Sequence, residues 1–168
     1  CGSTAPELLQ LTVSGVGADV GIALDGDGDR LVMVDHLGRL VDGDRLLYVI
    51  ARDRHSRGEL KGPVVGTVMS NLGLEQSLQA EGIPFLRAAV GDRYVLAMLR
   101  EHGGVLGGET SGHLLCLDRT TTGDGLVSAL QVLAVMRQKK QSLAELAAGM
   151  EKLPQVLLNV KVAKRYDP

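Results

Sequence analysis

Residues 63–90 of this 168-residue chain, PVVGTVMSNLGLEQSLQAEGIPFLRAAV, carry the clearest indication of its fold. It begins with an apolar run at 63–69, rich in β-branched residues, which is typical of a buried strand. Asn71 can cap a helix that Gly82 ends, and a second apolar run follows at 84–90. Strand, helix and strand in this order predict a layered α/β domain.

The same alternation continues in both directions along the chain. Downstream, we expect helices at 91–103, 122–139 and 142–150, strands at 105–108 and 113–118, and a closing strand at 154–164. Upstream, we expect helices at 6–15 and 43–56 and strands at 18–24 and 31–34. A turn at 35–38, after which residues 39–41 are again extended, predicts a hairpin. Asp42, Asp124 and Ser142 stand at helix starts, where their side chains can accept hydrogen bonds from free N–H groups.

The predicted fold class is α/β, with three layers (α/β/α) around a mixed, mostly parallel sheet. The hairpin near the N-terminal end predicts that this sheet is mixed rather than wholly parallel. The opening helix has no strand before it and the closing strand has no successor, so we interpret the sequence as an excerpt of a longer protein.

Composition excludes several classes of protein. With 45% hydrophobic and 23% charged residues, the chain can bury a core, so it is not a disordered tail. A net charge of −2 and 2% aromatic residues provide neither a basic surface nor stacking platforms, so we expect no nucleic-acid partner and no membrane. Two cysteines form no disulfide framework, which favours a reducing cytoplasm.

The segment LDGDGDRL, residues 24–31, places three aspartates at alternating positions. Carboxylates roughly 5 Å apart repel by about 3 kcal/mol at an effective dielectric constant of about 20. A solvated turn is the ordinary interpretation of Asp-Gly pairs. Three aspartates separated by glycines, however, can turn toward one cation, and oxygen ligands suit Mg²⁺ or Ca²⁺.

The EF-hand pattern can be tested by position and fails. It requires a glycine at the sixth position and a glutamate at the twelfth, where this chain has Arg30 and His36. Three carboxylates from one loop leave coordination positions for water and phosphate oxygens, as at many magnesium sites. Arg30 would add a forked donor to the same phosphate. We therefore expect Asp25, Asp27 and Asp29 to hold Mg²⁺ beside a phosphate group.

A second polar loop, GGETSGH at 107–113, lies between two predicted strands. A plain hairpin turn is one interpretation. If the segment is extended, alternation places Glu109, Ser111 and His113 on one side. Together these side chains could bind vicinal sugar hydroxyls.

DGDGDR followed by GETSGH closely resembles the α-D-phosphohexomutase superfamily. The segments VDGDRLLYVIA, PVVGTVMSNLGLE, VGDRYVL, TTTGDGLVSALQVL and LPQVLLNVKV resemble its bacterial branch that interconverts glucosamine 6-phosphate and glucosamine 1-phosphate. The resemblance implies a four-domain enzyme. Residues 1–41 would form the end of the second domain with the metal loop, and residues 42–168 the third domain with the sugar-recognition loop.

The resemblance also implies roles for individual residues. Asp25, Asp27 and Asp29 match the magnesium loop, and Arg30 matches its phosphate-facing arginine. Glu109, Ser111 and His113 match the sugar-recognition loop, with Thr110 at its variable middle position. Asp92 and Arg93 resemble a further substrate loop, although a helix start capped by Asp92 explains them equally well. His113 has a side chain suited to proton transfer at a sugar hydroxyl, or to hydrogen bonding alone.

The implied reaction passes through a phosphoserine and a bisphosphate sugar. The serine belongs to the family's first domain and the grip on the substrate's phosphate to its fourth, and neither matches a segment here. The resemblance therefore implies that this chain alone is inactive. Two alternatives stay open: a phosphoglucomutase or phosphomannomutase of the same superfamily, and a non-catalytic module that binds metal or sugar.

Overall fold

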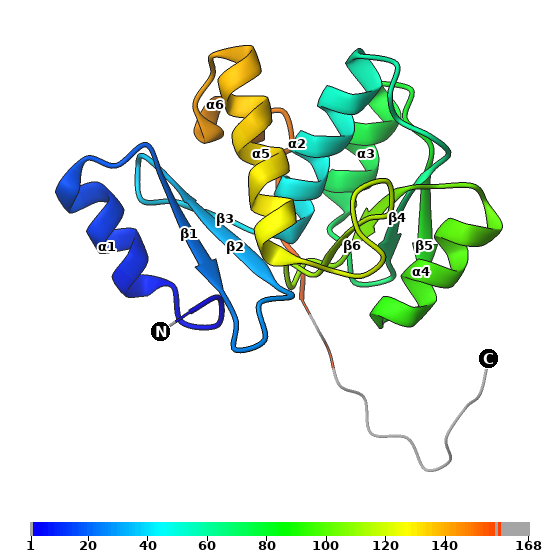
Figure 1. Ribbon diagram of the computed structural model, residues 1–168, viewed down its shortest axis with the longest axis horizontal. Coiled ribbons are helices and arrows are strands. Elements are labelled where there is room, and N and C mark those ends of the chain that lie inside the picture. The colour runs from blue at the N-terminus through cyan, green and yellow to red at the C-terminus, as the bar shows by residue number, and fades with distance from the viewer. Residues whose placement is uncertain (1, 157, 159–168) are drawn as a thin grey trace, which may run out of the picture.

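The computed structural model describes residues 2–156 and 158 (Figure 1). Along the chain the elements are α1 (Glu7–Val16), β1 (Val20–Leu24), β2 (Leu31–Asp35), β3 (Leu40–Val41), α2 (Gly43–Ser56), β4 (Val64–Thr67), α3 (Leu72–Ala80), β5 (Phe85–Ala88), α4 (Asp92–Glu101), β6 (Leu106–Gly108), β7 (Leu114–Cys116), α5 (Gly125–Lys139) and α6 (Leu143–Ala147).

Two sheets organise these elements. The larger has the order β5-β4-β6-β7, in which β4 pairs in parallel with β5 and β6, and β7 runs antiparallel to β6. The predicted fold class, with a mixed and mostly parallel sheet, is confirmed. The prediction that the N-terminal hairpin makes this sheet mixed is wrong. The hairpin strands β1, β2 and β3 form a separate antiparallel sheet, and the antiparallel member of the larger sheet is β7.

Helices cover both faces of the larger sheet. Val64 of β4 packs in a core with α2, α3 and α5, whereas its neighbour Val65 packs on the opposite face with Val95 and Leu99 of α4. This alternation is what a strand buried on both faces requires. The smaller sheet lies between α1 and α5, as Figure 1 shows.

Most predicted helix starts are confirmed by their hydrogen bonds. The side chains of Asp42, Asn71 and Asp124 accept from the backbone N–H groups of Arg45, Gly73 and Val127. Ser142 forms a capping box with Glu145.

Two local predictions differ from the structure. Asp92 does not cap α4: the N-cap residue is Gly91, and no side chain caps this helix. The closing strand predicted at 154–164 is not formed by residues 154–156 or 158, and its remainder lies outside the described residues.

The two sheets meet at the loop after β1. The N–H of Leu31 donates to Gly112 O at 3.0 Å, and the N–H of Gly125 donates to Gly28 O at 2.9 Å. The loop at 25–30 is thereby attached both to the turn before β7 and to the first residue of α5. The predicted division after residue 41 falls at the end of β3 and stays a prediction.

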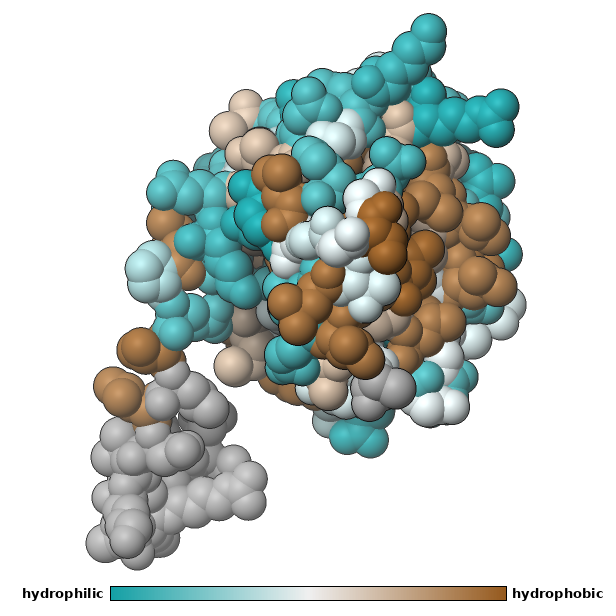
Figure 2. Space-filling model, turned by 90° about the vertical axis from the view of Figure 1, so that its left-hand side faces the viewer, coloured by the Kyte–Doolittle hydropathy of each residue, from teal (hydrophilic) through white to brown (hydrophobic). Residues whose placement is uncertain are grey.

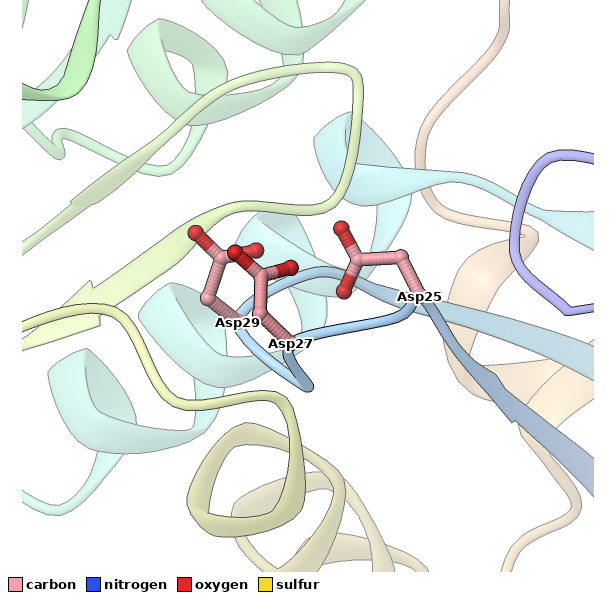
Figure 3. A group of neighbouring side chains, drawn as sticks. All are labelled: Asp25, Asp27 and Asp29. Carbon is pink, nitrogen blue, oxygen red and sulfur yellow. The ribbon is translucent and has the colours of Figure 1, made fainter.

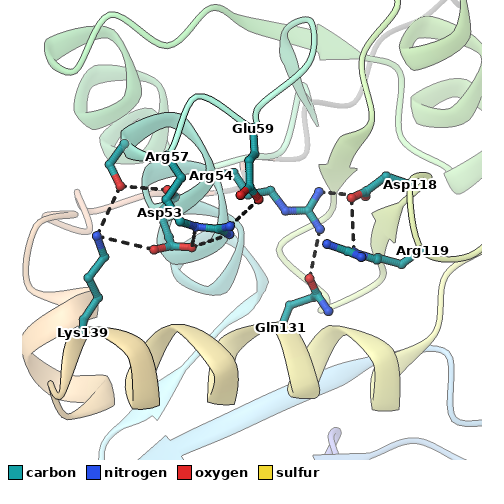
Figure 4. A network of polar contacts seen from close by, with 9 residues as sticks. Asp53, Arg54, Arg57, Glu59, Asp118, Arg119, Gln131 and Lys139 are labelled. Atoms are coloured by element: carbon teal, nitrogen blue, oxygen red, sulfur yellow. Dashed lines mark hydrogen bonds and ion pairs between the residues drawn. The ribbon is translucent and has the colours of Figure 1, made fainter.

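The surface combines an apolar face with a charged network. Leu8, Leu11 and Val16 of α1 are exposed, and Figure 2, which views this side, shows apolar side chains gathered there. A charged network joins α2, α5 and the segment after β7 (Figure 4), with the buried Arg54 bonded to Asp118. Among the described helices, none is long and apolar enough to cross a membrane.

Candidate functional site

The loop between β1 and β2 brings three carboxylates together. One ligand oxygen from each of Asp25, Asp27 and Asp29 lies within 4.8 Å of the others. Figure 3 shows the three side chains on the same side of the loop. Gly28 adopts φ 77°, a conformation in which a side chain would be strained, so the glycine between Asp27 and Asp29 permits this curvature.

Asp29 is held from outside the loop. Its Oδ2 lies 3.1 Å from His113 Nδ1, so an Nδ1–H group can donate to this oxygen. Among the described residues, the buried Asp29 Oδ1 has no hydrogen-bond partner. A buried carboxylate oxygen without a donor is costly. A cation between the three carboxylates would satisfy it, so the residues present fit a hard divalent ion.

Asp25 is prepared for the ionised state. Partial burial acts to raise the pKa of its carboxyl, but hydrogen bonds outweigh this effect, chiefly the one from the N–H of Arg30 at 3.1 Å, and hold the pKa below its ordinary value. The guanidinium of Arg30 lies beside the same carboxylate, with Nε 3.7 Å from Asp25 Oδ2, and the Arg30 side chain is half exposed. Arg30 therefore lies beside the aspartate cluster with donors accessible from solvent.

The segment 109–112 is a tight turn rather than the extended segment that the alternation assumed. The N–H of Gly112 donates to Glu109 O at 2.9 Å, and Gly112 has φ 94°. Glu109 and Ser111 still lie together, with Ser111 Oγ 3.4 Å from Glu109 Oε2. His113 points instead to Asp29. The turn thus presents a carboxylate and a hydroxyl side by side, next to the aspartate cluster.

The loop before α4 reaches this turn through its backbone. The N–H of Gly91 donates to Glu109 Oε1 at 2.9 Å. The exposed side chains of Asp92 and Arg93 are engaged locally: Asp92 accepts from the N–H of Arg93, and the Arg93 guanidinium lies 4.5 Å from the centre of the Tyr94 ring. In this structure Gly91, rather than Asp92 or Arg93, bonds to the turn at 109–112, which is called the recognition turn below.

Sequence reasoning missed two residues that shape the site. A Cβ at Gly123 would lie 2.3 Å from His113 Nε2, so this glycine covers the ring nitrogen that does not face Asp29. Asp44, in the first turn of α2, accepts a hydrogen bond from Thr110 Oγ1 at 2.8 Å. Asp44 belongs to a Gly-Asp-Arg tripeptide that recurs at 28–30 and 91–93, and this recurrence could have drawn attention to it.

Comparison with known proteins gives a family match. The family model described as phosphoglucomutase/phosphomannomutase, alpha/beta/alpha domain III, matches residues 42–153. This range begins at the cap of α2 and includes the recognition turn.

Among curated relatives, phosphoglucosamine mutase of Alkalilimnicola ehrlichii is 65% identical over 98% of this chain, which covers 36% of that protein. Phosphoglucosamine mutase of Methylococcus capsulatus is 64% identical over 99% of this chain, which covers 37% of that protein. A solved phosphoglucomutase/phosphomannomutase family protein from Burkholderia thailandensis superimposes with a TM-score of 0.79 at 30% identity, over 89% of this chain and 33% of that one. The chain thus spans about a third of the length of these relatives.

Proposed function

The chain belongs to the phosphoglucomutase/phosphomannomutase family, and from this premise we propose that it is part of a phosphoglucosamine mutase. Such an enzyme interconverts glucosamine 6-phosphate and glucosamine 1-phosphate through a phosphoserine and a bisphosphate sugar. Identities of 65% and 64% to relatives that carry this name support the amino sugar over glucose or mannose phosphates.

The observation that carries the proposal is the aspartate cluster, in which His113 anchors Asp29 beside the recognition turn. Asp25, Asp27 and Asp29 would hold Mg²⁺ here. When bound, Mg²⁺ neutralises charge on the oxygens of a phosphoryl group in transfer. Arg30 would donate to the same phosphate, since its half-exposed guanidinium can leave Asp25 at little cost.

The recognition turn would contact the sugar. Glu109 can accept from sugar hydroxyls and Ser111 can donate and accept, and the two are adjacent. Asp92 and Arg93 are exposed at the neighbouring loop and would join the substrate contacts, Arg93 once its guanidinium leaves Tyr94.

His113 is better placed to orient Asp29 than to move a proton. Its Nδ1 faces Asp29 and its buried Nε2 faces Gly123, with no partner among the described residues. Proton transfer at a sugar hydroxyl is the alternative role. If a His113→Ala variant of a full-length protein containing this chain loses less than tenfold in turnover, proton transfer by His113 is excluded.

The phosphoserine and the phosphate-gripping domain of the proposed enzyme correspond to no segment of this chain. We therefore expect that the chain binds Mg²⁺ only weakly and has little or no affinity for hexosamine phosphates. The reducing cytoplasm favoured by its two cysteines belongs to the same proposal.

Calorimetric titration of the chain with MgCl₂ tests the metal site. We expect weak binding that Asp27→Asn reduces and that Asp19→Asn, a change at an exposed carboxylate outside the cluster, leaves as it is. Equal affinities for both variants would contradict the site. Sub-micromolar binding of Mg²⁺ or of a hexosamine phosphate would instead favour the non-catalytic module.

Assays of a full-length protein containing this chain test the substrate. We expect faster turnover of glucosamine 1-phosphate than of glucose 1-phosphate or mannose 1-phosphate. The reverse order would replace the amino-sugar proposal with the phosphoglucomutase or phosphomannomutase alternative.

A further inference from the structure

Asp44 is a fully buried carboxylate that the proposed chemistry does not use. Its Oδ2 accepts two hydrogen bonds, both 2.8 Å long, from the N–H of Asn71 and from Thr110 Oγ1. Its Oδ1 is buried with no hydrogen-bond partner in the part of the chain that the structure describes. Burial, the largest influence, raises the pKa of Asp44. A buried carboxylate of this kind lowers the stability of the fold, which points to a role for Asp44 beyond packing.

One partner, Thr110, is the residue between Glu109 and Ser111. Its hydroxyl donates to Asp44, and its carbonyl accepts from the N–H of Gly43 at 3.1 Å. A Cβ at Gly43 would lie 2.1 Å from Glu109 O, so the start of α2 packs directly against the turn. Thr110 is therefore held by the first turn of α2 both through its side chain and through its carbonyl group.

The other partner, Asn71, continues the network to the segment 152–155. Asn71 Nδ2 donates to Leu153 O at 2.8 Å, and its Oδ1 accepts from the N–H of Leu153 at 3.0 Å. Gln155 makes a further bond to the same side chain at 3.3 Å. Lys152 forms an ion pair with Asp42, the cap of α2. Segment 152–155 is thus attached to the helix whose first turn holds Thr110.

A pocket of about 600 Å³ separates the recognition turn from this segment. Thr110 and Met69 line it together with residues 152–156. Hydrogen bonds through Asp44 and Asn71 connect the turn to this segment. The ion pair of Lys152 with Asp42 adds a second connection through the start of α2.

We propose that Asp44 is a positioning residue that fixes the recognition turn through Thr110, and that Asn71 links the turn to segment 152–155. The proposal rests on the proposed function in that Glu109 and Ser111 are taken to contact the sugar. Without the Thr110 hydroxyl, a single backbone bond from Gly43 holds the centre of the turn, and Asp44 Oδ2 loses one of its two donors. The turn then samples geometries in which Glu109 and Ser111 no longer converge.

Steady-state kinetics of a full-length protein containing this chain test the positioning role. We expect Thr110→Val to raise KM for glucosamine 1-phosphate about tenfold, with kcat within about threefold of the parent, because substrate contacts are lost equally in the ground and transition states. The Mg²⁺ concentration for half-maximal activity should not change. Thr110→Ser, which keeps the hydroxyl, should restore KM to within about twofold. Equal KM values for the two variants would overturn the role of Asp44.

Amide NMR spectra of the 168-residue chain test the link without any assay of activity. Asn71→Ser keeps an N-cap hydroxyl for α3 but removes the bonds to Leu153 and Gln155. We expect it to shift the resonances of Thr110 and Ser111, and Thr110→Val to shift those of 152–155, whereas Thr110→Ser shifts neither set. Shifts confined to the neighbourhood of each substitution would overturn the link. An inactive full-length parent with the expected shifts would instead reject the proposed function and leave the network standing.

Discussion

Among single residues, Asp44 shows how the burial of one carboxylate makes the free energy of unfolding depend on pH. Its pKa is raised by burial above the ordinary value of 3.8, although hydrogen bonds from Asn71 and Thr110 act in the opposite direction. The folded chain therefore keeps the proton at pH values where the unfolded chain has released it. Stability falls as the pH rises between the ordinary and the raised value, because the folded state binds more protons there.

We predict that Asp44→Asn removes this dependence. Asparagine can still accept from Asn71 and Thr110 but does not titrate, so the free energy of unfolding of the variant relative to the parent should increase from pH 4 upward and become constant above the raised pKa. Urea denaturation at pH 4, 5, 6 and 7 measures this difference. A difference that is the same at every pH would contradict the prediction.

Among the elements, the start of α5 contacts both the aspartate loop and the histidine that holds it. Asp124 caps the helix, the N–H of Gly125 donates to Gly28 O, and Gly123 lies against the ring of His113. A loop of alternating aspartates and glycines has little side-chain packing of its own, so its shape depends on these neighbours. The helix start and the recognition turn together hold Asp29 in place.

We predict that Gly123→Ala weakens Mg²⁺ binding by about tenfold, a typical effect of disturbing a residue that orients a metal ligand. The new Cβ would displace the imidazole and break its contact with Asp29. Calorimetry with MgCl₂ on the chain measures the change. Gly15→Ala, where nothing lies within 4 Å of the added Cβ, is the matched control and should bind as the parent does. Unchanged affinity in a folded Gly123→Ala variant would show that His113 does not orient Asp29.

Across the molecule as a whole, charged side chains join elements that also pack together in the apolar core: α2, α5 and β7 with the segment that follows it. Arg54 of α2 has only 4% of its side chain exposed and bonds to Asp118 after β7 and to Gln131 of α5 (Figure 4). Arg119 pairs with the same Asp118 but is 52% exposed. The two arginines share a partner and differ in burial, so they separate the contribution of a buried ion pair from that of an exposed one.

We predict that Arg54→Met lowers the free energy of unfolding by about 2 kcal/mol, since two hydrogen bonds of a buried guanidinium are lost. Arg119→Met should change it by less than about 0.5 kcal/mol, because exposed ion pairs contribute little. Urea denaturation at neutral pH compares them. Similar losses for the two variants would mean that burial does not determine the strength of this network.

The type and order of the elements, most helix caps, the α/β class and the composition of the two polar loops could be predicted from the sequence. These features depend on residues close together in the chain: apolar spacing, capping side chains, and glycines among aspartates. Of the closing strand predicted at 154–164, residues 154–156 and 158 are not in a strand, and the remainder lies outside the described residues.

Which surfaces meet could be seen only in the folded chain. The hairpin strands could have joined the larger sheet, and local pattern alone does not choose between one sheet and two. The contacts of His113 with Asp29 and of Thr110 with Asp44 join residues 84 and 66 positions apart. Such pairs depend on how α2, α5 and the turn before β7 pack around one another, and the free energy of that packing is a property of the assembled core rather than of any segment.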